Sequence, residues 1–191
     1  ASNTAVGAAA LYANTTGHSN IAAGSNALAA NTTGYRSTVV GFNAGDACTT
    51  GRDNSIFGYE AGGAVTTGIE NTILGYYAGA ATTTSDYNTF VGSGAGQANT
   101  TGAANTTIGA AAGDAITTGS NNTIAGRDAG GVLTTGTNCL FLGHDSGLSG
   151  SPGGAITTGS NDIALGDENI DTANIQVDWT VASDKRDKTD V

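Results

Sequence analysis

The sequence predicts an all-β fold, a parallel β-solenoid (β-roll) wound from coils of 17 residues. Glycines recur every 17 residues, a short apolar segment precedes each of them, and columns of Ala, Asn and Thr keep the same phase. Equivalent side chains of successive coils are therefore expected to lie over one another along a rod. We expect this solenoid over residues 1–171, followed by a closing strand over 172–182 and a separate C-terminal segment over 183–191.

One column of glycines, called here the reference glycines, sets the period. Each follows the previous one after 17 residues, except that the last follows after 23. The excess lies in the segment LSGSPGG, which holds the single proline, Pro152, so we expect a surface loop that leaves the neighbouring coils undisturbed. The reference glycines are Gly7, Gly24, Gly41, Gly58, Gly75, Gly92, Gly109, Gly126, Gly143 and Gly166.

A strand of three to five residues is expected directly before each reference glycine. These segments are short, rich in β-branched and aromatic residues, and bounded by Gly and Asn. Asn opens most of them, where its side chain can bond to turn backbone and tolerate a left-handed conformation. Long helices are excluded, because each of the frequent glycines would cost up to about 1 kcal/mol relative to Ala. The segments are TAV, IAA, TVV, SIF, TIL, TFV, TTI, TIA, LFL and IAL.

Alanine and threonine form further columns. Ala stands three and six residues after most reference glycines, which indicates positions too crowded for larger side chains. Thr pairs stand eight and nine residues after them, beginning with Thr15 and Thr16. These columns raise ice binding as one alternative function, although adjacent threonines in a strand point to opposite sides.

Composition limits the classes of partner. Six basic residues against sixteen acidic ones give a net charge of −10, so no basic stripe can neutralise nucleic-acid phosphates. No segment is apolar and long enough for a transmembrane helix, so no membrane insertion is expected. Large apolar side chains are too scarce for a thick core. Each coil therefore depends on its neighbours, and we expect the chain to self-associate.

No metal site and no cofactor are predicted. His18 and His144 lie far apart and at different phases of the repeat, so neither is expected to build a metal site with the carboxylates. Cys48 and Cys139 lie in different coils, roughly 25 Å apart at strand spacing, too far for a disulfide between them. No carboxylate pair stands out as a catalytic centre, and an enzymatic role is not expected.

Four aromatic residues form the candidate binding site. Phe42, Tyr59 and Tyr76 each follow a reference glycine in three consecutive coils, and Tyr77 adjoins them. Stacked at strand spacing, they would form an aromatic strip along the rod. Such a strip can hold sugar rings or pack against a partner chain, and the sequence leaves both interpretations open.

The repeats resemble a known class of fibrous proteins. NTAVGAAALYANTTGHSN and SNALAANTTGYRSTVVGFNAG are similar to repeats of phage tail fibres and of trimeric autotransporter adhesin heads. The resemblance implies a homotrimeric fibre in the tail of a virion, which takes part in attachment to a host cell-surface receptor, with a glycan as one candidate ligand. The alternative that it implies is a trimeric adhesin on a bacterial cell surface.

The C-terminal residues carry a second resemblance. Residues 175–182, IQVDWTVA, alternate apolar and polar side chains as a half-buried strand does. The following SDKRDKTDV resembles the opening of the chaperone-of-endosialidase domain, an intramolecular chaperone that assembles trimers and then cuts itself off. That resemblance implies self-cleavage before Ser183, with Asp184 assisting and Arg186 and Lys188 at the motif's basic positions. Nine residues supply no complete site, so no catalysis is expected of this segment alone.

Overall fold

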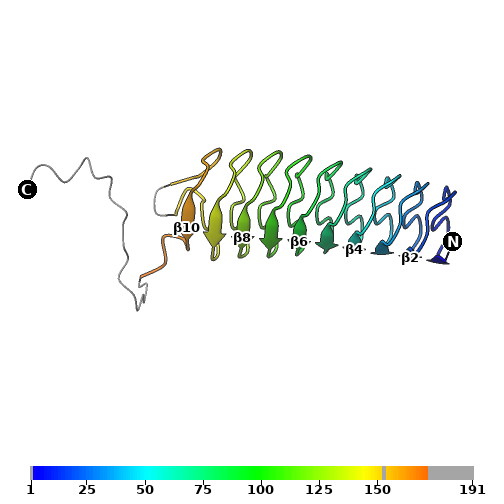
Figure 1. The fold of residues 1–191 in the computed structure, drawn as a ribbon. Helices are drawn as coiled ribbons and strands as arrows, with labels where there is room; N and C mark the ends of the chain where they lie inside the picture. Colours follow the sequence, from blue (N-terminus) through cyan, green and yellow to red (C-terminus); the bar gives the residue numbers. More distant parts are fainter. Residues whose placement is uncertain (1, 152–153, 172–191) are drawn as a thin grey trace, which may run out of the picture.

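The computed structural model describes residues 2–151 and 154–171, and these form a parallel β-solenoid. Ten three-residue strands line one side of the coils in sequence order, β1 to β10, as one ten-stranded parallel sheet (Figure 1). The predicted fold class is confirmed. The strands are β1 (Thr4–Val6), β2 (Ile21–Ala23), β3 (Thr38–Val40), β4 (Ser55–Phe57), β5 (Thr72–Leu74), β6 (Thr89–Val91), β7 (Thr106–Ile108), β8 (Thr123–Ala125), β9 (Leu140–Leu142) and β10 (Ile163–Leu165).

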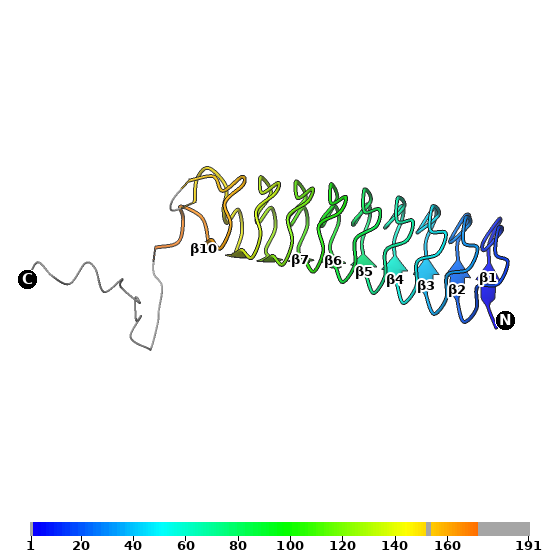
Figure 2. The same cartoon turned by 45° about the horizontal axis from the view of Figure 1, so that its top comes forward.

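The strand register follows the 17-residue period. Ile56 pairs with Ile73, for example, and every neighbouring pair from β1 to β9 has the same offset. Between β9 and β10 the offset becomes 23, with Phe141 opposite Ala164. The extra residues therefore bulge out of the final coil without disturbing strand pairing, as the sequence predicted. Figure 2 shows the coils stacked along the rod and the widened last coil at its C-terminal end.

Close coil spacing explains the reference glycines. From Gly7 to Gly126 their φ angles lie between 131° and 145°, a region that side chains rarely adopt. A Cβ atom at Gly58 would lie 2.3 Å from the carbonyl oxygen of Gly75 in the next coil. Backbone packs directly on backbone at this corner, so only glycine fits.

The core is narrow and lies between the strands and the first alanine column. The middle residue of each strand from β2 to β10 is buried, as in Ile56 and Phe90. Ala61 and its equivalents in other coils, three residues after the reference glycine, are buried too. The second alanine column, which includes Ala64, is only partly buried. The prediction of a crowded position is therefore wrong for that second column.

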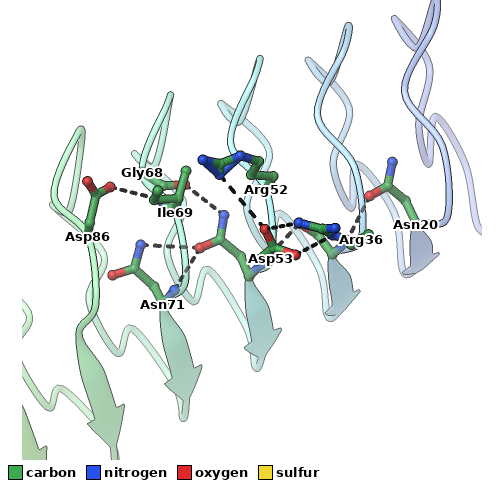
Figure 3. Close-up of polar contacts among 10 residues, drawn as sticks. Asn20, Arg36, Arg52, Asp53, Gly68, Ile69, Asn71 and Asp86 are labelled. Atoms are coloured by element: carbon green, nitrogen blue, oxygen red, sulfur yellow. Dashed lines mark hydrogen bonds and ion pairs between the residues drawn. The ribbon is translucent and has the colours of Figure 1, made fainter.

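Buried asparagines form a polar ladder beside the core. Asn71 donates from Nδ2 to the carbonyl oxygen of Ser85 at 2.9 Å, and its Oδ1 accepts the backbone N–H of Asn88 at 3.0 Å. Figure 3 shows the same contacts between Asn71 and the preceding coil. The predicted bonding to backbone is confirmed, but the left-handed conformation belongs to the residue before each of these asparagines, such as Glu70. The ladder is formed by Asn20, Asn54, Asn71, Asn88, Asn105 and Asn122.

Several other sequence-based expectations concern single residues or the chain end. Cys48 and Cys139 are both buried free thiols, in agreement with the absence of a disulfide between them. Among the described residues, no helix has the length and apolarity that a membrane span requires. The closing strand over 172–182 and the proposed self-cleavage residues Ser183, Asp184 and Lys188 lie outside the described residues.

Candidate functional site

The four predicted aromatic residues come together on one side of the rod. They follow β3, β4 and β5, whose pairing stacks the coils in register. The ring centroids of Phe42 and Tyr59 lie 5.3 Å apart with planes at 13°, and those of Tyr59 and Tyr76 lie 5.5 Å apart with planes at 21°. All three side chains are exposed. The period alone brings these rings together, and the chain itself places them at strand spacing.

The aromatic group differs in shape from the expected strip. Its rings stack face to face, so each inner face is covered by the next ring. Tyr77 packs edge-on against Tyr76, with centroids 4.6 Å apart and planes at 74°. The group therefore forms a short stack with two free ends, closed on one side by Tyr77, and we call it the aromatic stack.

Glu60 fixes the position of two tyrosine hydroxyls. Its carboxylate accepts hydrogen bonds from Tyr59 and Tyr77. The hydrogen bond to Glu60 raises the pKa of Tyr77 to about 12, since the bond and the negative charge favour the neutral phenol. Tyr77 is thus a neutral donor near pH 7, held in one orientation beside Tyr76. Sequence spacing could have located this carboxylate, because Glu60 stands in the same column of the repeat as Tyr77, one coil earlier.

Two adjoining hollows begin where the aromatic stack ends. After Tyr76 and Tyr77, the same two columns hold Ser93 and Gly94, and this drop in side-chain size opens a hollow of about 360 Å³ that Gln97 also lines. A second hollow of about 500 Å³ shares Tyr77 and Gln97 with it and is otherwise lined mostly by alanine. Sequence reasoning missed both hollows, although the change from Tyr-Tyr to Ser-Gly one period later is visible in the sequence.

The outer side of the sheet is a long apolar surface, called here the strand face. It consists of the first and third residues of the ten strands, none of which is charged. Leu74 is 47% exposed, and large apolar side chains are exposed at nearly every level of the rod. The exposed members are Val6, Ile21, Val40, Phe57, Leu74, Ile108, Leu142, Ile163 and Leu165.

The threonine pairs present one exposed file of hydroxyls. The first Thr of each pair donates its hydroxyl to the backbone of the next coil, as Thr49 does to the carbonyl oxygen of Thr66 at 3.2 Å. The second Thr of each pair, such as Thr67, is exposed. The two members therefore differ in role, and the pair offers a single file rather than two.

A network of charged side chains crosses the coils beside the asparagine ladder. Arg36 donates to both carboxylate oxygens of Asp53, one coil later, at 2.6 and 2.8 Å (Figure 3). Arg52 approaches the same carboxylate at 3.8 Å. The arginines hold the pKa of Asp53 below its usual value. These groups are largely solvent-exposed, so the pair contributes no more than about 1 kcal/mol.

His144 has carboxylate neighbours that the sequence analysis did not anticipate. Ligand atoms of Asp128, His144 and Asp145 lie within 4.8 Å of one another, because two consecutive coils place them side by side. The expectation that His144 would lack carboxylate neighbours is therefore wrong. The guanidinium group of Arg127 contacts both Asp128 and the Nε2 atom of His144. A cationic side chain of the chain itself thus occupies the space between these groups.

Comparison of the chain with known protein families, with curated proteins and with solved structures finds no match. The candidate surfaces of the described residues are thus the strand face and the aromatic stack with its hollows, and both are defined by geometry alone.

Proposed function

We propose that this chain is a structural segment of a homotrimeric fibre, a rod that spaces or presents a receptor-binding end and takes part in attachment to a host cell. The observation that carries this proposal is the uncharged, apolar strand face along the entire rod. The role is structural rather than enzymatic. The resemblance of the repeats favours a phage tail fibre and hence location in the virion.

The size of the strand face supports self-association. Its nine large exposed side chains offer on the order of 700 Å² of apolar surface, close to the roughly 800 Å² per partner of a standard interface. Monomeric proteins rarely expose a patch of more than about 600 Å². Leaving such a surface in water would be costly for a chain with so narrow a core.

Charge favours association through this face rather than another. Chains with a net charge of −10 repel one another, so contact is favoured where charge is absent. The strand face meets this condition at every level. Parallel copies in register could match one apolar side chain per coil, and three copies around a common axis would leave no strand face exposed.

The alternative is a trimeric adhesin on a bacterial cell surface. The exposed aromatic stack and its hollows favour this alternative, because they offer a recognition surface on the rod itself. The sequence of the gene beyond Val191 discriminates between the two, since a membrane anchor there would favour the adhesin.

Multi-angle light scattering tests the self-association on which both alternatives depend. The purified chain is expected to have the mass of three copies, and the double variant L74D/I108D is expected to be monomeric, because it puts two carboxylates per chain into the interface. Thr67→Asp, at an exposed corner of the coil, is the matched control and should remain trimeric. A monodisperse monomer for the unmodified chain would overturn the proposal.

A further inference from the structure

We propose that the hollow at the C-terminal end of the aromatic stack binds a neutral hexose glycan, with one sugar ring on the free face of Tyr76. This inference rests on the proposed attachment role and assigns a ligand class to it. The site consists of Tyr76, Tyr77, Ser93, Gly94 and Gln97.

The first step of the argument is the free face of Tyr76. Tyr59 covers one face of this ring by stacking at 5.5 Å. The next residue in the column is Ser93, which is too small to cover the other face. Tyr77 stands at 74° to Tyr76 and walls one side of the hollow. The result is a flat apolar wall at the edge of an open hollow of about 360 Å³, within the usual range for ligand sites.

The second step is the polar groups around that wall. The Gln97 side chain is exposed and offers both an amide donor and a carbonyl acceptor, and the exposed Ser93 hydroxyl can donate and accept. A pyranose ring combines an apolar C–H face with hydroxyl groups around its rim. It can therefore stack on Tyr76 and bond at its rim to Ser93 and Gln97, whereas a planar aromatic ligand would leave these polar groups without partners.

The third step is charge, which selects a neutral ligand. Glu60 lies beside Tyr77, and Asp114 lines the adjoining hollow. Carboxylates at both positions would repel uronic or sialic acids. Because the two hollows share Tyr77 and Gln97, a glycan of two or more units could continue along the alanine-lined floor toward Asp114.

Isothermal titration calorimetry with maltopentaose, cellopentaose and mannopentaose tests the proposal, with pentagalacturonate as the acidic comparison and choline as the cationic one. We expect one of the neutral pentasaccharides to bind and neither charged probe to bind. Tyr76→Ala should weaken that binding at least tenfold, and Tyr12→Ala, which removes an exposed tyrosine in the first coil, should leave it unchanged.

Ser93→Tyr is the decisive variant, because it should extend the aromatic stack by one ring and fill the hollow without loss of fold. It is expected to abolish glycan binding while light scattering still reports three copies. No binding of any neutral pentasaccharide, undiminished binding by Ser93→Tyr, or binding of choline in their place would overturn the glycan site. Loss of trimers in Tyr76→Ala would identify the stack as a subunit interface and would also overturn it. The mass measurement judges the fibre proposal separately.

Discussion

The ring of Phe90 lies directly against Gly96, where a Cβ atom would come within 2.7 Å of the ring. The same relationship recurs along the rod: where the middle of a strand carries a large side chain, the residue four positions after the following reference glycine is glycine. In the second coil the sizes are exchanged, with Ala22 in the strand and Leu28 at the other position, both buried. The two positions thus share one volume in each coil, as close packing of the interior requires.

Shared volume predicts that Gly96→Ala destabilises the solenoid. The added methyl group meets the Phe90 ring, and overpacking of this kind costs about 1–3 kcal/mol. Gly94→Ala is the control, because Gly94 also has a positive φ but its Cβ would meet only the end of Gln97 at 3.5 Å. Urea unfolding should show a larger loss for Gly96→Ala, and Phe90→Val should restore part of it. Equal losses in the two glycine variants would contradict the packing explanation.

Thr107→Val is expected to stabilise the protein. Thr107 occupies the fully buried middle position of β7, and its hydroxyl makes no hydrogen bond to another protein atom. A buried hydroxyl without a partner costs about 1–3 kcal/mol, and valine has nearly the same shape without that cost. Thermal unfolding should show a higher Tm. Thr106→Val, in the same strand but partly exposed, should change Tm little. A lower Tm for Thr107→Val would show that the hydroxyl has a partner after all.

The pH dependence of stability is expected to change in Asp114→Asn. Partial burial, together with the nearby Asp128, raises the pKa of Asp114. A raised carboxyl pKa means that the ionised form is disfavoured in the folded state, so this residue destabilises the protein at neutral pH. That penalty disappears as the pH falls through the raised pKa toward about 4, the ordinary value.

Asp114→Asn should therefore have a higher Tm than the parent at pH 7, and the difference should shrink toward pH 4. Glu70→Gln, which removes an exposed carboxylate, serves as the control. A difference in Tm that grows as the pH falls would contradict the sign assigned to Asp114.

Cys48 is expected to react slowly with thiol reagents in the folded protein. Burial raises its pKa to about 11, so both access and the thiolate fraction are small at pH 8. Iodoacetamide labelling followed by mass spectrometry should modify Cys48 slowly in buffer and rapidly in urea. Fast labelling of Cys48 without denaturant would show that the coil opens locally at this position.

Much of the fold follows from the sequence, because a strict period fixes which residues lie over one another. The 17-residue offset of the strands, the file of reference glycines and the outward loop in the last coil were all predicted in this way. The second alanine column was misjudged, since small side chains occur both where space is absent and where a surface is merely flat. Ala61 and Ala64 look alike in the sequence, and only one is buried.

The sequence by itself determined the period, and with it the stacking of Phe42, Tyr59 and Tyr76 and the neighbours of each strand. Only the tertiary structure decided which direction each column faces. Side-chain direction depends on φ and ψ at every corner of the coil, and these corners place the strand face outward, the asparagine ladder inward and the free face of Tyr76 beside a hollow. Repetition specifies which residues are neighbours, whereas backbone geometry decides what those neighbours can touch.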